Sequence, residues 1–439
     1  MTNSNSSVYT DANQTPPMSE AIPLGVQHVL AMFASNVTPS VIVAGAAGLA
    51  FGGEQQIYLI QMAMLFAGIA TLFQTVGFGP VGARLPIMQG TSFAFVGVLA
   101  GIAATQGLDV ALTSCIIAGL IHFALGSVIV RIRSWFPPLV TGLVILAIGL
   151  YLIPVGIKYA AGGAADFQMQ ADSFGSLKHW SVALTVIVVA LIVKFRTSGL
   201  LSNAAILIGL IAGYVLAYVL GMVSFGAVAK ASWITGLQVL PYGFEFNLGA
   251  VIGVTLVSIV SAVETVGDAS ATTKAGADRE ATDAEISGAT YADGLGTAVA
   301  GVFGGLPNTS FSQNVGIVGM TGVMSRHVVT IAGILMLLCG LLPKVGATIA
   351  SMPLPVLGGG VIVMFGMVAA AGLNVLSEIQ MSRRNMIIIA ISLTVGLGLN
   401  LVPSAVQYLP GIWKTLATSA VAPTAFLAIV LNQILPEDS

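Results

Sequence analysis

The chain has very little charge. Asp, Glu, Lys and Arg together make up 7% of its 439 residues, whereas hydrophobic residues make up 56%. A globular protein in water usually carries about a quarter of charged residues, so this composition excludes a soluble fold. Apolar runs of about 20 residues recur along the chain, and this is the length that a helix needs to cross a bilayer. The composition therefore predicts a membrane protein with many spans.

Cysteines and catalytic motifs are also scarce. The two cysteines, Cys115 and Cys339, lie in apolar runs of different halves. They are too few for a disulfide framework or a cysteine-rich metal site, so we expect two small buried residues. The sequence contains no HExxH motif, no phosphate-binding G-x-x-x-x-G-K-[ST] loop and no Ser-His-Asp spacing. It also has no basic patch for nucleic acid. We expect neither an enzyme nor a resident cofactor or metal.

The apolar runs predict an all-α fold with about fourteen membrane spans. Their approximate bounds are 22–50, 57–77, 85–104, 109–130, 135–153, 180–194, 203–222, 248–268, 288–305, 309–325, 327–342, 353–374, 385–402 and 415–435. Residues 1–20 are polar and lack the basic start and apolar core of a cleaved signal peptide. We expect them to form a short disordered tail in the cytosol.

The basic residues predict the orientation of these spans. If the N-terminus lies inside and the number of spans is even, every arginine falls on the cytosolic side. The lysines that fall outside are Lys158, Lys178, Lys230, Lys344 and Lys414. An excess of basic residues in cytoplasmic loops is the rule in membrane proteins. We therefore expect both termini in the cytoplasm, and the protein in the plasma membrane, which in bacteria is the inner membrane.

The chain repeats itself. TSFAFVG at residues 91–97 returns as TSFSQNVG at residues 309–316, and each follows a Leu-Pro pair. FPPLVTGLVILAIG at residues 136–149 returns as MPLPVLGGGVIVMFG at residues 352–366, at nearly the same offset of about half the chain. Proline and glycine recur in any membrane protein, but two echoes at one offset favour duplicated halves. An odd number of spans in each half makes this an inverted repeat.

Proline, glycine and hydroxyl residues interrupt the apolar run in both copies of the first echo. Broken helices leave backbone groups unpaired, and these are tolerated at membrane depth only inside protein or beside a cavity. Interruptions at matching positions of inverted halves indicate the substrate site of a transporter. The freed N–H groups and the helix dipole beyond each break could then face a polar substrate.

Glu264, Asp268 and Asp293 are the acidic residues that fall within predicted spans. Glu264 and Asp268 are four residues apart and therefore share a helix face. No Lys or Arg lies in the interior of a span, so the sequence offers these acids no ion-pair partner. An acid in a span is by default part of a substrate site or a proton relay. Alternatively, Asp268 and Asp293 cap helix ends at the cytosolic mouth. Gln27 and His28, early in the first span, either support the site or only pack.

The segment SQNVGIVGMTG resembles a family signature. Its Gln313, Asn314, Gly316, Thr321 and Gly322 fit the pattern Q/E-N-x-G-x-x-x-x-T-G of the nucleobase–ascorbate transporters, also called nucleobase:cation symporter-2. The Gln-His pair of the first span and the segment ETVGD are similar to two other motifs of that family. Three motifs in the same order, over nearly the whole chain, make the resemblance specific.

The resemblance implies a fold of seven plus seven spans in which spans 3 and 10 contain short extended segments that meet at the substrate. It also implies a division into domains and, by analogy, a homodimer formed through the gate domain. The implied parts are a tail (1–20), a core domain (21–133 and 248–345) and a gate domain (134–247 and 346–439).

The resemblance also assigns roles to residues. Glu264 and Gln313 would hydrogen-bond a nucleobase, Phe93 and Ser312 would offer backbone groups, and Phe311 would offer a stacking face. Ser92 falls where some xanthine-specific members have Asn. The residues that would support the site and its coupling are Asp268, Asp293, Asn314, His28 and Gln27.

Gln313 bears on the choice of substrate. The family's uracil members have a carboxylate at this position, so Gln favours an oxidised purine, xanthine or uric acid. Val315 departs from the usual xanthine-type signature and leaves the choice between them open, with a slight preference for a range that includes uric acid. We expect proton-coupled uptake. The alternatives are another nucleobase such as uracil, coupling to Na⁺, or an anion exchanger of the same fold, which would need a cationic site.

Overall fold

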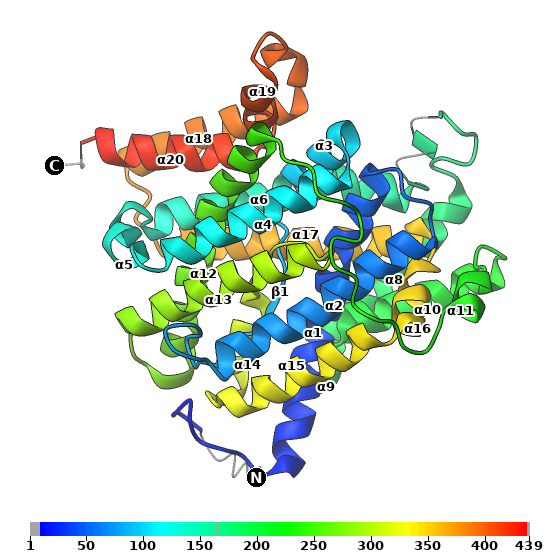
Figure 1. Cartoon of the computed structure of the whole chain (residues 1–439), viewed down its shortest axis with the longest axis horizontal. Coiled ribbons are helices and arrows are strands. Elements are labelled where there is room, and N and C mark those ends of the chain that lie inside the picture. Colours follow the sequence, from blue (N-terminus) through cyan, green and yellow to red (C-terminus); the bar gives the residue numbers. More distant parts are fainter. Residues whose placement is uncertain (1–8, 164–165, 168, 437–439) are drawn as a thin grey trace.

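The computed structural model describes residues 9–163, 166–167 and 169–436, and helices dominate it (Figure 1). In chain order the elements are α1 (Met18–Ala46), α2 (Glu54–Thr75), β1 (Gln89–Thr91), α3 (Val96–Gln106), α4 (Leu108–Leu125), α5 (Ile129–Ile132), the 3₁₀ turn η1 (Arg133–Trp135), α6 (Pro138–Ala160), α8 (Leu177–Arg196), α9 (Gly199–Asn203), α10 (Ala205–Val219), α11 (Gly226–Lys230), α12 (Leu248–Ala277), α13 (Asp283–Val302), β2 (Asn308–Ser310), α14 (Ser312–Thr321), α15 (Arg326–Leu341), α16 (Pro343–Ala350), α17 (Leu354–Ser377), α18 (Arg383–Leu401), the 3₁₀ turn η2 (Pro403–Val406), α19 (Gly411–Ala417) and α20 (Val421–Ile434).

Eight of the described helices are long and apolar enough to cross a membrane, or nine if α15 and α16, bent by 78° at their junction, form one span. The other predicted spans fall on helices that are shorter or more polar. Among them, α3 and α14 are half-helices that each follow a strand, and α13 begins with acidic residues that lower its hydropathy. A hydropathy count therefore finds fewer spans than the about fourteen expected from sequence.

The helices pack in two matching sets. The series α1, α2, α3, α4, α6, α8 and α10 corresponds in order to α12, α13, α14, α15, α17, α18 and α20. Helix α2 packs on α15 as α13 packs on α4, and α8 packs on α17 as α18 packs on α6. The two helices of the second sequence echo, α6 and α17, pack on each other. Each contact thus has a counterpart, which confirms the predicted repeat.

Glycines allow the two echo helices to approach closely. A Cβ atom added at Gly149 in α6 would lie 2.4 Å from the backbone nitrogen of Ala369 in α17. One added at Gly358 in α17 would lie 2.1 Å from the nitrogen of Ala160 in α6. Lipid offers no hydrophobic driving force between helices, so close packing at small residues has to hold them together. The glycines of the repeated segment therefore serve packing.

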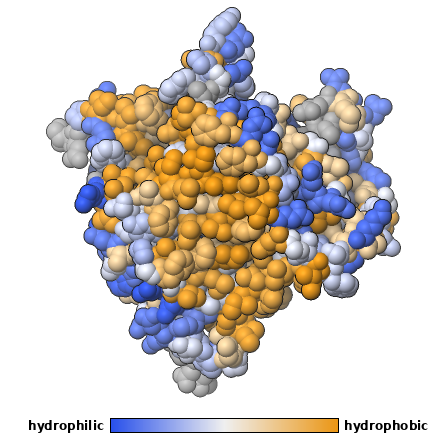
Figure 2. All heavy atoms as spheres, in the orientation of Figure 1, coloured by the Kyte–Doolittle hydropathy of each residue, from blue (hydrophilic) through white to orange (hydrophobic). Residues whose placement is uncertain are grey.

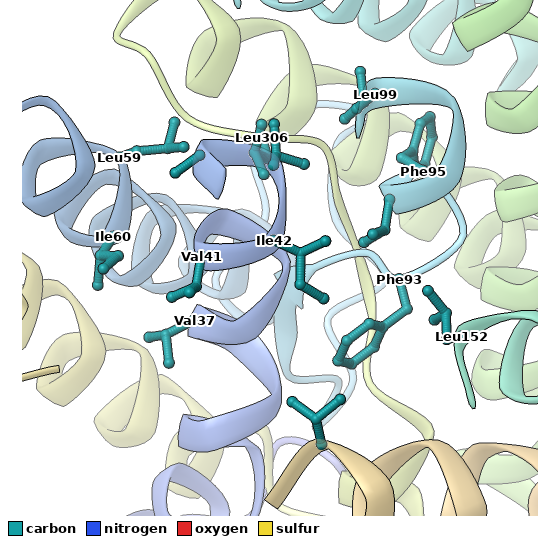
Figure 3. Close-up of a cluster of buried hydrophobic side chains, with 14 of the residues drawn as sticks. Val37, Val41, Ile42, Leu59, Ile60, Phe93, Phe95, Leu99, Leu152 and Leu306 are labelled. Atoms are coloured by element: carbon teal, nitrogen blue, oxygen red, sulfur yellow. The ribbon is translucent and has the colours of Figure 1, made fainter. Parts of the chain in front are cut away.

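A cluster of buried hydrophobic side chains fills the centre of the molecule, and its members come from several helices. Figure 3 shows residues from α1, α2, the segment around β1 and α3, the approach to β2, and α6. Those labelled are Val37, Val41, Ile42, Leu59, Ile60, Phe93, Phe95, Leu99, Leu152 and Leu306. The strands therefore lie inside a packed apolar interior, with no lipid beside them (Figure 1).

The outer surface is apolar where lipid would cover it. Hydrophobic residues occupy the middle of the face in Figure 2, and hydrophilic residues gather toward its edges. Helix α8 exposes Leu191, Ile192 and Phe195, and α18 exposes Ile387 and Ile391. A soluble protein rarely exposes apolar patches of this kind. The chain is therefore a multi-pass integral membrane protein.

Part of the N-terminal tail contacts the rest of the protein. We expected disorder over residues 1–20, of which residues 1–8 lie outside the described part of the chain. Ala12 is buried, and its carbonyl accepts a hydrogen bond from the backbone N–H of Arg326 at 2.9 Å. Helix α1 already begins at Met18. The described part of the tail thus has backbone hydrogen-bond partners in the α14–α15 connection.

Both cysteines carry free thiols. Cys115 is buried in α4 and Cys339 is half-buried in α15. The prediction of a small buried residue is confirmed for Cys115, whereas Cys339 is only half-buried.

Candidate functional site

The two interrupted segments meet. Strands β1 and β2 pair antiparallel, with Gly90 opposite Thr309 at the centre of the register, and every residue of both strands is buried. The pairing satisfies backbone groups that lipid could not. It confirms the expectation that the two TSF segments, far apart in sequence, come together in the fold.

Matching threonines satisfy the next backbone groups of the strands. The N–H of Gln89 donates to the hydroxyl of Thr71 in α2 at 2.9 Å, and that hydroxyl faces the Gln89 carbonyl at 3.4 Å. The N–H of Asn308 donates to Thr297 in α13 at 3.0 Å, and that hydroxyl faces the Asn308 carbonyl at 3.3 Å. Helices α2 and α13 are equivalent in the repeat, so each half supports its own strand in the same way.

A half-helix follows each strand, with Phe95 as the N-cap residue of α3 and Phe311 as that of α14. Both helices therefore direct their N-terminal ends toward the strand crossing. The first N–H groups of a helix have no partner inside it, and the helix dipole is positive there. In α3 the N–H groups of Val96 and Gly97 already bond to the Phe93 carbonyl and the Tyr151 hydroxyl, so this end contributes its partial positive charge rather than free donors to the crossing.

A cavity of about 190 Å³ lies beside this crossing. Its lining residues are Thr91, Phe93, Ala94, Ile145, Ile148, Glu264, Thr309, Ser310, Phe311, Ser312, Gln313, Met367, Val368 and Ala371. Pockets for drug-sized ligands measure roughly 300–1,000 Å³, so this cavity suits a smaller molecule. Both segments and α12 supply its polar wall, whereas α6 and α17 supply apolar side chains. None of the lining residues is a lysine or an arginine.

Two polar side chains in this lining are available to a ligand. Glu264 comes from α12 and Gln313 from the first turn of α14. Within residues 9–163, 166–167 and 169–436, no group makes a hydrogen bond to either side chain. A carboxylate accepts hydrogen bonds, whereas the Gln amide both donates and accepts. Together they can pair with a ligand edge that presents both kinds of group.

Asp268 lies behind the cavity lining, where two hydroxyls bond to it. Ser310 donates to Oδ2 at 2.6 Å and Ser312 donates to Oδ1 at 2.8 Å. Asp268 is buried in the interior of α12, nine residues before the helix ends at Ala277. The alternative of a helix-end cap is therefore wrong. The carboxylate holds two lining residues in place.

Asp293 is more deeply enclosed, with an exposed fraction of 0%. Its Oδ1 accepts hydrogen bonds from the amides of Gln89 at 2.5 Å and Gln74 at 3.1 Å, and Thr265 bonds to Oδ2. Asp293 also lies in the middle of α13, whose N-terminus is capped by Thr282 instead. The cap alternative is wrong here too. Asp293 connects α2, α12, α13 and the start of β1.

Asn314 connects α14 to the first helix. Its amide nitrogen donates to Nδ1 and to the carbonyl oxygen of His28, both at 3.0 Å. Acceptance at Nδ1 requires that this ring nitrogen carry no proton. Gln27 is buried beside His28. The Gln-His pair and the Gln-Asn pair of the sequence motifs are thus brought together next to Gln313, which lines the cavity.

Ser92 is the predicted ligand residue that does not line the cavity. Its N–H donates to the Pro307 carbonyl at 2.9 Å, and its hydroxyl is buried without a partner in the described part of the chain. Strand β1 ends at Thr91, and Ser92 is left out of the lining although its neighbours Thr91 and Phe93 belong to it. The other predicted ligand residues, including Phe93 and Phe311, do line it.

Several site residues were not predicted. Gln74 and Gln89 had a signal, since an amide inside an apolar run usually has a structural partner. No sequence signal marked the apolar residues of the cavity wall, because they are of the same types as the other hydrophobic residues of their spans. The wall residues are Ile145, Ile148, Met367, Val368 and Ala371.

The sequence is similar to those of known proteins over most of its length. A family model, Xan_ur_permease, described as "Permease family", matches residues 19–405. The uric acid permease PucK of Bacillus subtilis is 37% identical over 93% of this chain and 94% of its own length. The xanthine permease of B. subtilis is 34% identical over 94% and 93%.

Among solved structures, the transmembrane domain of a cyanobacterial bicarbonate transporter, BicA, aligns with a TM-score of 0.62 at 15% identity, covering 95% of this chain and 98% of that one. This likeness concerns the fold, which is the seven-plus-seven inverted repeat. The sequence matches go further. They extend over most of the chain and show that it belongs to this permease family, on the xanthine and uric acid permease branch of the nucleobase–ascorbate transporters, with transport rather than catalysis as its function.

Proposed function

We propose that the protein is a proton-coupled symporter that takes up an oxidised purine base, xanthine or uric acid or both. One observation carries the proposal: Glu264 and Gln313 lack partners in the described chain, and both line a small cavity beside the crossing of the two interrupted segments. The relatives named above as xanthine and uric acid permeases support this choice of substrate.

The chemistry of such a base suits the cavity. A purine dione is flat, and N–H donors alternate with C=O acceptors around its edge. Ionised Glu264 accepts N–H groups, and the Gln313 amide pairs with one donor and one acceptor. The aromatic faces of Phe93 and Phe311 add contact area and orientation. A base that lacks these edge groups would leave buried polar groups of the site unpaired, so the site would reject it.

The carboxylates couple the substrate to protons in this proposal. One acid of the pair Glu264 and Asp268 takes a proton from the outer side, and the base binds beside it. The core domain (21–133 and 248–345) then moves against the gate domain (134–247 and 346–439), so that proton and base leave inward. The absence of Lys and Arg from the cavity lining disfavours an anion exchanger.

A ligand panel tests the substrate. Xanthine, uric acid, hypoxanthine, uracil and ascorbate are added to the purified protein, and its thermal unfolding is followed. A ligand that binds only the folded state raises its stability by mass action, by about 2.7 kcal/mol at a hundred times its Kd. We expect xanthine or uric acid to raise the unfolding temperature most. A larger effect of uracil or ascorbate would contradict the proposal.

Uptake into vesicles tests the coupling ion. We expect accumulation that does not depend on sodium and that a protonophore abolishes. Accumulation that needs sodium and survives the protonophore would replace H⁺ by Na⁺, for which carboxylate and carbonyl oxygens are also suitable ligands. We further propose that both termini lie in the cytoplasm and that two copies pair through the gate domain. Reporter fusions and light scattering in detergent test these two points.

A further inference from the structure

Tyr151 of α6 reaches into the first turn of the interrupted span. Its hydroxyl accepts a hydrogen bond from the N–H of Gly97 at 2.9 Å and donates one to the carbonyl of Phe93 at 3.3 Å. The side chain is 8% exposed, so these bonds are shielded from water. Phe93 lines the cavity, whereas α6 belongs to the proposed gate domain. The two bonds therefore cross between the proposed domains at the substrate site.

The Tyr151 hydroxyl takes the place of a backbone hydrogen bond between Gly97 and Phe93. Residues 93 and 97 are four apart, and in a regular α-helix the N–H of Gly97 would donate directly to the carbonyl of Phe93. Here the Tyr151 hydroxyl lies between them, and the Phe93 carbonyl accepts from Val96 at 3.1 Å in a tighter turn. A side chain of one domain thus replaces a helical hydrogen bond of the other.

Packing around this point is close. A Cβ atom on Gly97 would lie 3.0 Å from the ring of Tyr151, so the position leaves no room for a side chain without displacing that ring. The ring of Phe93 meets Phe365 of α17 edge to face, with centroids 5.4 Å apart at 87°. Both helices of the second sequence echo therefore hold the segment that lines the cavity.

We infer that the Tyr151 hydroxyl is a latch: it fastens the substrate segment to the gate domain in this state and is released when the domains move. The inference rests on the domain movement of the proposed function. If the domains separate, Gly97 and Phe93 can bond to each other, so neither backbone group is left unpaired in the membrane. The latch can therefore open without a large penalty. Tyr151 is a positioning residue that acts through Phe93.

Tyr151→Phe tests the latch, with Tyr159→Phe as the matched control. Tyr159 lies on the same helix and is similarly buried, but its hydroxyl has no hydrogen-bond partner within the described ranges. Gly97→Ala serves as a second variant, because it displaces the tyrosine ring and leaves the hydroxyl in the protein. All variants also carry Cys115→Ala and Cys339→Ala, so that only the introduced cysteines are labelled. Spin labels are attached at Met320→Cys in α14 and Leu373→Cys in α17. The natural residues at these two positions are 67% and 55% exposed.

Pulsed electron spin resonance then measures the label distances without any substrate. We expect Tyr151→Phe and Gly97→Ala to lower the ratio of the present state to the other state about tenfold, which equals about 1.4 kcal/mol. Tyr159→Phe should leave the ratio unchanged. In vesicles, Tyr151→Phe should change the exchange rate at saturating purine at least threefold.

A ratio in Tyr151→Phe within twofold of that in Tyr159→Phe would overturn the latch. A lower unfolding temperature with an unchanged ratio would likewise mean that the hydroxyl only supports the fold. Neither distance result depends on which base is carried, so the latch can fail while purine uptake stands. Conversely, a protein that moves no purine would still show the distance shift if the latch exists.

Discussion

At the scale of single residues, the three intramembrane carboxylates differ in what surrounds them. Asp268 receives two serine hydroxyls, and Asp293 receives two amides and a threonine. Glu264 lines the cavity without a hydrogen-bond partner in the described chain. Glu264 is also only half-buried, whereas the other two acids are buried. Its oxygens are therefore accessible to a ligand that donates hydrogen bonds, and those of Asp268 and Asp293 already accept bonds within the protein.

Gln313→Glu should weaken the binding of an oxidised purine at least tenfold. The change removes the amide donor and puts a second negative charge beside Glu264, and an unpaired partner in a buried site costs roughly 1–3 kcal/mol. Titration calorimetry with xanthine and uric acid measures the loss. Gln407→Glu adds the same charge at an exposed position outside the cavity and is the control. Unchanged affinity in Gln313→Glu would show that the amide does not contact the base.

The sequence indicated most of the polar site but not its geometry. Glu264, Asp268 and Asp293 could be named because carboxylates are conspicuous in apolar runs. Whether a carboxylate has hydrogen-bond partners depends on residues of other helices, such as Gln74 for Asp293. The spacing of residues within one segment does not predict those contacts. Ser92 was assigned to the ligand by resemblance alone, and it does not line the cavity.

At the scale of elements, each of the two short strands at the site is held by a hydrogen bond to a neighbouring helix, in addition to the bonds between the strands. The interruptions at residues 91–97 and 309–316 were readable as breaks, since Pro, Gly and hydroxyl residues do not continue an apolar helix. That they meet was implied by the family resemblance. The supporting threonines of α2 and α13 were not predicted, because a threonine in a span more often bonds to its own helix.

Thr71→Val and Thr297→Val should destabilise the protein by similar amounts, about 1–2 kcal/mol each. Each change keeps the side-chain shape but removes the hydroxyl that satisfies a strand N–H, and a buried group left without its partner costs energy of this order. Thermal unfolding of the purified variants measures both. Thr105→Val, at an exposed threonine, should have little effect. A large loss in only one of the two variants would contradict the equivalent roles of the two halves.

At the scale of the whole molecule, the repeat builds a membrane protein whose polar centre is shielded on all sides. The apolar exterior was evident from composition, but the bounds of individual helices were not. Helix α14 covers only ten residues of the predicted span 309–325, because hydropathy averages over a strand, a helix and a turn alike. Disorder was expected for the tail because it is polar, and composition does not predict the backbone hydrogen bonds that Met324 and Arg326 donate to its described part.

In the proposed mechanism, an unpaired carboxylate at the strand crossing links purine movement to protons. The most direct measurement is uphill uptake of labelled xanthine or uric acid into vesicles with a proton gradient, comparing the natural protein with Glu264→Gln. We predict that the natural protein accumulates the base and that Glu264→Gln does not, because the amide neither carries the proton nor offers a negatively charged acceptor to the N–H groups of the base. Unchanged accumulation by Glu264→Gln would contradict the account.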